Sequence, residues 1–347
     1  MEYLNATSFL LNNTETPLVD VRSPSEYAQG HITGAVNIPI FNDLERESVG
    51  TIYKRSGREE AIEKGLEYIG PKLKKIAAEA KKIAYRDQLR VYCFRGGMRS
   101  EKMSWLFELV GIRCFVLQGG IKAYRQQLLE DFAGIKRLII LQGSTGSGKT
   151  EILQKMRKLG EQVIDLENAA NHRGSAFGDV GLGDQPTSQQ FQNDIHDALI
   201  RMDPDRRIWL ESESLTIGKV YLPETLWETM NRSTLVEINI PRDKRIERIV
   251  TDYGHYDREL LIEKTKKIQK RFGGNNVKKV VGLIDEGKLA EAVDLLLHYY
   301  DKSYAFSQEK YKGANPIVIH SKTGDATVNA SLIINKINGM SPEEWKK

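Results

Sequence analysis

The chain has 347 residues, of which 40% are hydrophobic and 28% are charged. These are the proportions of a globular protein of about two domains. No run of ~18 apolar residues occurs, so we expect no membrane-spanning helix. The two cysteines exclude a disulfide framework and favour a reducing, cytoplasmic location. The formal net charge of +4 permits a polyanionic partner but does not establish one.

The first part of the chain predicts a parallel α/β domain. Three short apolar runs predict buried strands, at residues 18–21, 89–93 and 114–117. Apolar residues spaced three and four positions apart predict helices over 65–82 and 98–109. Because alternating strands and helices are typical of a parallel sheet, we expect one such domain over residues 1–132.

A second α/β domain is predicted over residues 133–347. Five apolar runs predict its strands, at residues 136–141, 162–166, 207–210, 235–238 and 316–320. A glycine-rich loop follows the first of these strands directly and leads into a predicted helix. The segment at about 242–304 is rich in charge and is predicted to be a helical, basic insertion between the last two strands.

The glycine-rich loop has the sequence GSTGSGKT, which fits the pattern G-x-x-x-x-G-K-[ST] in full. Glycines let backbone N–H groups turn toward a phosphate, and the start of a helix adds a favourable dipole. We therefore predict a phosphate site formed by Gly143, Ser144, Thr145, Gly146, Ser147, Gly148, Lys149 and Thr150. Lys149 is expected to reach the terminal phosphate, and Thr150 supplies the hydroxyl that a Mg²⁺ ion would use.

This motif does not distinguish a nucleotide from another compound that carries a diphosphate. An acidic partner for the loop, or for a metal ion, is expected where a neighbouring strand ends. The two candidates are Glu211, with Glu213 two residues further on, and Asp165. Glu211 can equally be an ordinary acid at the end of a strand, and for Asp165 that ordinary role is the favoured interpretation. The sequence establishes no metal ligands, and we expect no tightly bound cofactor.

A second loop begins at Cys93, which ends an apolar strand and is followed by FRGGMRS before the next predicted helix. The backbone N–H groups of such a loop, the start of the helix and the side chains of Arg95 and Arg99 all stabilise a thiolate. The same groups would hold an anion, or a persulfide or perselenide on the sulfur. We therefore predict a catalytic site of Cys93, Arg95 and Arg99, with Cys93 as the nucleophile.

The segments around this loop resemble the signatures of rhodanese domains. They are DVRSPSEYAQGHITGAVNIP at 20–39 and GGIKAY at 119–124. The resemblance covers roughly residues 4–130 and implies a sulfurtransferase-like domain in which Cys93 carries the chalcogen. The spacing between Cys93 and Arg99 is C-x5-R, which is also that of cysteine phosphatases, so a phosphatase-like site remains an alternative.

A rhodanese-like domain followed by a phosphate-loop domain resembles the bacterial tRNA 2-selenouridine synthase family. The cysteine loop carries the resemblance, with Phe94 in place of the family's tryptophan, as do HRGSAFG at 172–178, QPTSQQF at 185–191 and ESES at 211–214. The resemblance implies a transferase that converts 2-thiouridine at the wobble position of tRNA to 2-selenouridine through S-geranyl-2-thiouridine. Geranyl diphosphate and selenophosphate would be the donors. The phosphate loop would then bind the diphosphate, and Cys93 would serve selenium transfer.

Basic residues of the second domain are predicted to contact tRNA or substrate. They are His172, Arg173, Arg242, Arg245, Lys267, Lys270 and Arg271. The last three belong to a stretch from Lys264 to Lys279 that contains no acidic residue. A solvated helix face explains such a stretch equally well. For the whole chain, the main alternative is an ATP-dependent kinase with a rhodanese- or phosphatase-like regulatory domain, and a sensor without turnover ranks last.

Overall fold

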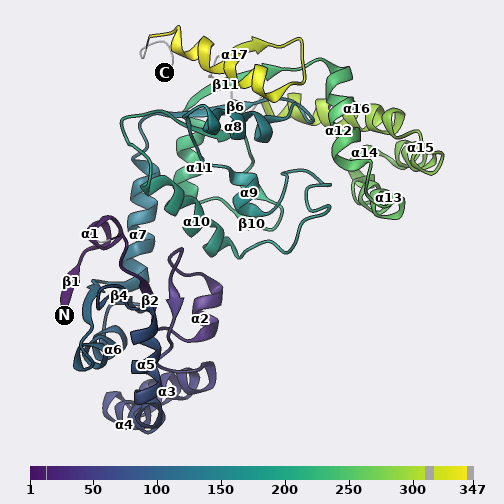
Figure 1. Cartoon of the computed structure of the whole chain (residues 1–347). Helices are drawn as coiled ribbons and strands as arrows, with labels where there is room; N and C mark the ends of the chain where they lie inside the picture. The colour runs from purple at the N-terminus through teal and green to yellow at the C-terminus, as the bar shows by residue number, and fades with distance from the viewer. Residues whose placement is uncertain (13, 309–315, 342–347) are drawn as a thin grey trace. The chain divides into compact units, whose positions relative to one another are not determined.

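The computed structural model describes residues 1–12, 14–308 and 316–341, and the chain divides into two compact units (Figure 1). Unit 1 consists of Met1–Phe132 and Gln189–Ile200, and unit 2 consists of Ala133–Ser188 and Arg201–Lys347. Each unit contains a five-stranded sheet whose paired strands are parallel. The predicted fold class, two parallel α/β structures in one chain, is therefore confirmed.

The sheet of unit 1 has the strand order β1-β5-β4-β2-β3. Its strands are β1 (Glu2–Leu4), β2 (Leu18–Asp20), β3 (Val36–Asn37), β4 (Gln88–Tyr92) and β5 (Arg113–Leu117). The connecting helices are α1 (Ala6–Leu11), α2 (Pro24–Gln29), α3 (Asp43–Arg55), α4 (Arg58–Ile69), α5 (Leu73–Ile83), α6 (Met98–Leu109) and α7 (Gly120–Ala133). The central strands β2 and β4 are almost entirely buried, as expected for parallel strands that helices cover on both faces.

One helical segment of unit 1 differs from the prediction. The apolar periodicity predicts a single helix over 65–82, whereas the structure separates α4 from α5 by a 3₁₀ turn at Gly70–Lys72. Pro71 lies inside this turn. Its ring lacks the N–H group that would donate to the carbonyl oxygen four residues earlier, so the continuous α-helix is interrupted there.

Helix α10 (Ser188–Ile200) lies within the second domain predicted from the sequence, whereas in the structure it is part of unit 1 from Gln189 onward. Its Asn193 side chain donates a hydrogen bond of 2.8 Å to the His31 carbonyl oxygen. Its buried His196 lies with Nε2 2.8 Å from a carboxylate oxygen of Asp131. The partners are 162 and 65 positions apart in the sequence, so no local pattern indicates these contacts.

The sheet of unit 2 has the order β12-β11-β6-β8-β7. Its strands are β6 (Leu138–Gln142), β7 (Gln162–Val163), β8 (Ile208–Glu211), β11 (Thr234–Asn239) and β12 (Ile317–His320). A separate antiparallel pair consists of β9 (Thr216–Ile217) and β10 (Val220–Tyr221). Helices beside the main sheet are α8 (Lys149–Lys158), α9 (Leu166–Ala170), α11 (Glu224–Asn231) and α17 (Ala326–Asn338). Apolar side chains of α8, α17 and the strands form one buried core.

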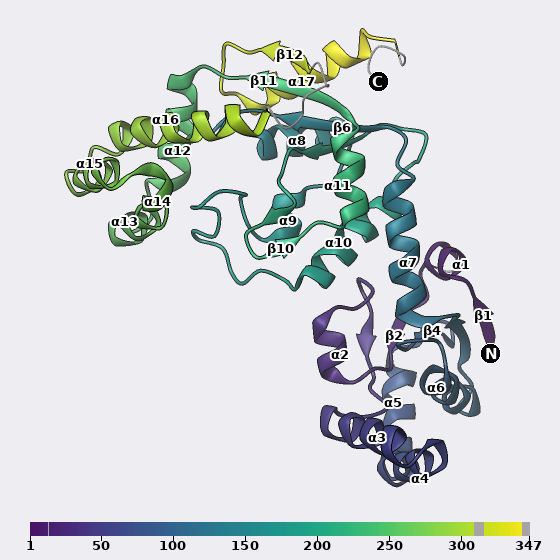
Figure 2. The ribbon, with the colours of Figure 1, turned by 180° about the vertical axis from the view of Figure 1, so that it is seen from behind.

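The charged segment between β11 and β12 is helical. It comprises α12 (Arg242–Tyr253), α13 (Arg258–Lys267), α14 (Gln269–Phe272), α15 (Gly274–Asp285) and α16 (Leu289–Gln308). Figure 2 shows α13, α14 and α15 gathered at one end of α16. A small apolar core of its own holds these helices together, and it includes Leu261, Phe272, Val280 and Ala292. In the described part of the chain, no helix combines the length and apolar character needed to cross a bilayer.

Candidate functional site

The phosphate loop lies between the buried strand β6 and helix α8, which begins at Lys149. Gly148 is the N-cap of this helix and has a φ of +75°, a left-handed conformation that favours glycine. A Cβ atom on Gly148 would lie 2.6 Å from the Arg248 guanidinium carbon of α12. The NH1 nitrogen of Arg245, also on α12, donates to the Thr145 carbonyl oxygen at 3.1 Å. The loop is thus held in place by α12 on one side.

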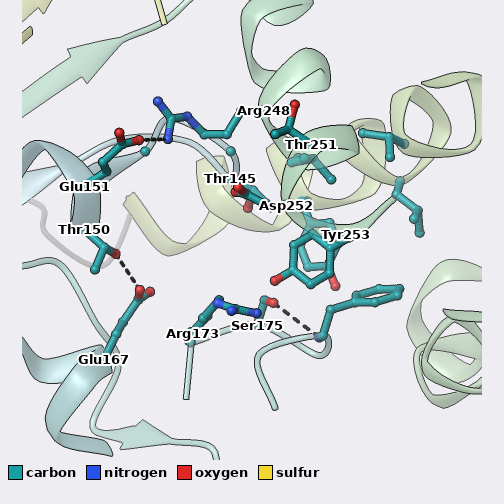
Figure 3. Close-up of a pocket in the computed structure, with 18 of the residues that line it drawn as sticks. Thr145, Thr150, Glu151, Glu167, Arg173, Ser175, Arg248, Thr251, Asp252 and Tyr253 are labelled. Atoms are coloured by element: carbon teal, nitrogen blue, oxygen red, sulfur yellow. Dashed lines mark hydrogen bonds and ion pairs between the residues drawn. The ribbon is translucent and has the colours of Figure 1, made fainter. Parts of the chain in front are cut away.

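The two motif side chains that are expected to meet a phosphate are both within reach of the loop. The Lys149 ammonium group donates to the Gly143 carbonyl oxygen at 2.9 Å. The Thr150 hydroxyl donates to a carboxylate oxygen of Glu167 at 2.5 Å (Figure 3). A phosphate in the loop would draw the Lys149 ammonium group toward itself, because a charged acceptor forms a stronger hydrogen bond than a carbonyl oxygen.

The two acids predicted from strand ends have different surroundings. Glu211 ends β8 and is fully buried, and its Oε1 accepts the backbone N–H of Glu167 at 2.7 Å. Burial, and next the negative charge of Asp165, raises the pKa of Glu211 well above its usual value. Asp165 caps α9 by accepting the Asn168 N–H at 2.9 Å. Neither carboxylate lines the cavity described below, so neither would contact a ligand bound in it.

The carboxylates that do line the cavity next to the phosphate loop include Glu167 and Glu213. Burial, and next the charge of Glu167, raises the pKa of Glu213 to about 8, and Lys149 opposes this rise. From the sequence, Glu213 is predicted only as a neighbour of Glu211, and Glu167 is not predicted. Glu167 is two residues beyond the predicted strand end at Asp165, and no motif indicates that α9 turns it toward Thr150.

One cavity of about 770 Å³ opens from the phosphate loop, and all residues that line it belong to unit 2. The motif contributes Thr145, Gly146, Gly148, Lys149 and Thr150 to its wall. Glu151 and Arg248 form an ion pair at the edge of this polar end (Figure 3). Among the described residues, no group of three or more His, Cys, Asp or Glu side chains is arranged to hold a metal ion. The arrangement is suited to binding an anion together with a larger attached group.

The cysteine loop of unit 1 connects β4 to α6. Cys93 is only 3% exposed, and its sulfur lies 3.2 Å from the Ser100 hydroxyl oxygen in the first turn of α6. The loop packs against the Gly119-Gly120 turn, because the Ile121 N–H donates to the Cys93 carbonyl oxygen at 2.9 Å. Gly120 has a φ of +61°, and a Cβ atom there would lie 2.4 Å from that same oxygen. The second rhodanese signature therefore shapes the backbone around the sulfur.

The two arginines predicted to assist Cys93 have other partners in this structure. The Nη1 atom of Arg99 lies 2.6 Å from a carboxylate oxygen of Glu26 on α2. Burial favours the neutral form of Glu26, but the hydrogen bond and charge of Arg99 outweigh it and lower the pKa of Glu26. The Arg95 guanidinium lies 5.7 Å from the ring centroid of Phe94, which is itself exposed. The structure thus brings Ser100, which was not predicted, closest to the sulfur.

His172 and Arg173, predicted as substrate contacts, lie in the loop after α9. The His172 Nδ1 atom accepts the Gly174 N–H at 3.2 Å, and burial lowers the pKa of His172. Arg173 lines the cavity, donates to the Val180 carbonyl oxygen at 3.0 Å and lies with its guanidinium 5.7 Å from the Tyr253 ring centroid. Of the two, Arg173 is the one that faces the cavity.

The other predicted basic contacts fall into two groups. Arg242 and Arg245 form ion pairs with acids of α16, at 2.6 Å to Asp294 and 2.8 Å to Asp301 respectively. These two arginines therefore fasten α12 to α16. By contrast, the basic side chains around α14 are exposed, at Lys266, Lys267, Lys270, Arg271, Lys278 and Lys279. This exposed group, which we call the basic face, includes Lys267, whose ammonium lies 3.0 Å from a Glu263 oxygen.

Comparison with known proteins gives matches over both units. A family described as the tRNA 2-selenouridine synthase AAA domain matches residues 136–330, and the rhodanese-like domain family matches residues 7–127. The chain is 36% identical to a tRNA 2-selenouridine synthase of Sulfurovum sp., over 87% of this chain and 91% of the relative. A Pseudomonas fluorescens relative of the same name is 35% identical over 86% and 90%. One from Shewanella denitrificans is 39% identical over 68% and 65%.

The fold and the two loops define a protein in which a rhodanese-like domain and a phosphate-loop domain share one chain. The chain belongs to the tRNA 2-selenouridine synthase family. The resemblance predicted from the cysteine loop and the phosphate loop is thereby confirmed.

Proposed function

We propose that this protein is a tRNA 2-selenouridine synthase that works in two steps. In the first step, the sulfur of a wobble 2-thiouridine attacks C1 of geranyl diphosphate. A carbon–sulfur bond forms, the carbon–oxygen bond to the diphosphate breaks, and the N3 proton of the base is released. In the second step, selenium from selenophosphate adds at C2 of the base, geranyl thiol leaves, and water cleaves the phosphorus–selenium bond. Family membership supports the overall conversion.

The observation that carries the first step is the phosphate loop opening into a cavity of about 770 Å³. This volume is within the range of about 300–1,000 Å³ that is usual for ligand sites. Lys149 and the loop amides would bind the diphosphate and stabilise its charge as it leaves. The proposal requires no tightly bound cofactor. A Mg²⁺ ion that arrives with the diphosphate would meet the Thr150 hydroxyl, which is held by Glu167.

For the second step we propose Cys93 as the residue that serves selenium transfer. Its sulfur lies beside the first turn of α6 and 3.2 Å from the Ser100 hydroxyl, which could donate a hydrogen bond to a chalcogen carried on the sulfur. Arg95 and Arg99 are proposed to balance negative charge, which for Arg99 requires release from Glu26. The basic face of unit 2 is proposed to bind the tRNA backbone, since exposed lysines and arginines suit phosphates.

The test supplies 2-thiouridine tRNA, geranyl diphosphate and selenophosphate to the wild type, Lys149→Ala and Cys93→Ala. Mass spectrometry of the digested nucleosides follows each product. We expect Lys149→Ala to block geranylation, and Cys93→Ala to accumulate S-geranyl-2-thiouridine without selenation. Loss of both steps in Cys93→Ala would refute this division of labour. Nucleotide hydrolysis that needs Lys149, without any geranylation by the wild type, would favour the kinase alternative.

A further inference from the structure

The cavity of unit 2 has two chemically different ends. The phosphate loop forms the polar end, as described above. The other end is lined by aliphatic side chains of three helices of the insertion. They are Leu261 of α13, Ile284 of α15, and Leu289, Ala292, Val293 and Leu296 of α16. We call this part of the cavity the apolar slot.

Aromatic residues mark the border between the two ends. Tyr253, at the end of α12, lies with its ring 6.2 Å from that of Phe177, and both line the cavity. On the polar side, Arg173 lies over the Tyr253 ring (Figure 3). A ligand that reaches from the phosphate loop past Tyr253 therefore passes from cationic and amide groups to hydrocarbon within one continuous space.

The slot is a poor environment for a nucleobase. Apart from the Tyr300 hydroxyl group of α16, which also lines the cavity, its walls are Leu, Ile, Ala and Val side chains, which neither donate nor accept hydrogen bonds. A base placed among them would lose its hydrogen bonds to water without replacing them, which is unfavourable. A hydrocarbon chain loses nothing of that kind, and water in such a slot is weakly held and easily displaced.

We propose that the apolar slot between α13, α15 and α16 binds the isoprenoid chain of the substrate whose diphosphate is held by the phosphate loop, and that α16 limits the length of chain accepted. This inference rests on the function proposed above and assigns a place to the hydrocarbon part of the donor. The occupant follows from continuity, because the slot and the phosphate loop are parts of one cavity.

Ala292 is the residue that most directly tests this assignment. It has the smallest side chain of the slot residues named above, and it is fully buried in the wall. Because Ala292 has no exposed surface, the three carbon atoms that leucine adds must displace the neighbouring side chains, and we expect this displacement to narrow the slot. Ala290 provides a matched control, since it is an exposed alanine two residues earlier on the same helix and does not line the cavity.

The experiment measures binding to the full-length wild type, Ala292→Leu and Ala290→Leu by calorimetry. The ligands are inorganic pyrophosphate, dimethylallyl diphosphate, geranyl diphosphate, farnesyl diphosphate and ATP. Each buried methylene contributes roughly a four-fold gain in affinity, so the wild type should bind geranyl diphosphate far more tightly than pyrophosphate. We expect Ala292→Leu to lower the affinity for geranyl diphosphate at least ten-fold. Its affinity for pyrophosphate should stay within two-fold of the wild-type value. Ala290→Leu should match the wild type throughout.

A complementary variant covers the case in which the larger side chain prevents folding. Leu296→Ala enlarges the slot, and we expect it to raise the affinity for farnesyl diphosphate relative to geranyl diphosphate at least three-fold. Its pyrophosphate affinity reports whether the phosphate loop is intact.

The outcomes distinguish a failure of the proposed slot from a failure of the proposed function. If folded Ala292→Leu binds geranyl diphosphate as the wild type does, or if Leu296→Ala leaves the farnesyl-to-geranyl ratio unchanged, the slot is wrong while the geranyl transfer proposal stands. If the wild type binds geranyl diphosphate no better than pyrophosphate, both proposals fail. If the wild type binds ATP tightly and Ala292→Leu abolishes that binding, the slot is a nucleotide site and the inference is overturned.

Discussion

The protein contains two loops of the same general design, each leading from a buried parallel strand into a helix, but they differ in what surrounds them. The loop after β6 opens into a cavity of about 770 Å³. The loop after β4 encloses a sulfur atom that is 3% exposed. Lys149 donates only to a carbonyl of its own loop in the bonds described, whereas Arg99 is committed to Glu26. The Lys149 ammonium group could therefore turn to a bound anion without breaking an ion pair described here, while Arg99 would have to leave Glu26 before its charge could act at Cys93.

Glycine substitutions provide the largest expected effects and compare the two loops directly. In Gly120→Ala the new Cβ atom meets backbone atoms only, at 2.4 Å from the Cys93 carbonyl oxygen, and the residue keeps a φ of +61°. In Gly148→Ala it meets the flexible end of Arg248 at 2.6 Å. We expect Gly120→Ala to lower the free energy of unfolding by about 3 kcal/mol and Gly148→Ala by about 1–2 kcal/mol.

Urea unfolding, followed by fluorescence, measures these losses. Gly97→Ala is the matched control, because a Cβ atom at that position of the cysteine loop meets nothing within 4 Å. It should change the free energy of unfolding by less than about 1 kcal/mol. An equal loss in all three variants would show that the backbone of the cysteine loop is no more constrained than that of the phosphate loop.

The second prediction concerns the pH dependence of stability, which should differ between the units. The folded pKa of Glu213 is raised to about 8, from an ordinary 4.5. Between these two values the folded state holds a proton that the unfolded state has lost, so stability falls as the pH rises. Glu211, whose pKa is also raised, contributes in the same direction. One such group can lower the free energy of unfolding by up to about 1.4 kcal/mol per pH unit.

Thermal unfolding of the wild type and Glu213→Gln from pH 5 to pH 8 tests this. The wild type should lose stability across the range, and the variant should lose clearly less because glutamine does not titrate. Glu228→Gln, an exposed carboxylate change on α11, should keep the wild-type slope. If stability falls with pH as steeply in Glu213→Gln as in the wild type, Glu213 is ionised throughout this range.

A third, smaller effect is expected from the ion pair that occupies Arg99. Its side chain and that of Glu26 are 19% and 22% exposed, so we expect a coupling of about 1 kcal/mol in a double-mutant cycle with Arg99→Gln and Glu26→Gln. The folded pKa of Glu26 is lowered, so the coupling is present above pH 4.5 and is lost as the pH falls through the lowered value. A coupling that persists in acid would not come from this carboxylate.

The sequence predicted those parts of the protein that depend on local signals. The phosphate loop and the strand and helix that flank it were predictable, because glycine positions, a lysine and an apolar run occur together within a few residues. The hydrogen bond between Glu167 and Thr150 was not predictable, since it depends on where α9 packs. The pairing of Arg99 with Glu26 joins residues 73 positions apart and leaves no pattern in the sequence.

The apolar slot is another feature that local sequence signals do not predict. Leu261, Ile284 and Ala292 each read as an ordinary apolar core residue of their own helix, and all three do pack into the core of the insertion. Only the arrangement of α13, α15 and α16 shows that one side of that core faces a cavity shared with the phosphate loop. Composition and periodicity predict burial, but they do not distinguish burial against protein from burial against a ligand.

The smallest expected effect separates the exposed basic residues from the paired ones. Lys270→Gln should weaken tRNA binding about three-fold, and it should reduce the slope of log affinity against log salt by about 0.7–0.9, because one phosphate contact is lost. Arg242→Gln should leave that salt slope unchanged and instead lower the melting temperature, since Arg242 joins α12 to Asp294 of α16. Filter binding at several salt concentrations measures both variants. A salt slope that changes in Arg242→Gln, and not in Lys270→Gln, would move the tRNA contact from the basic face to α12.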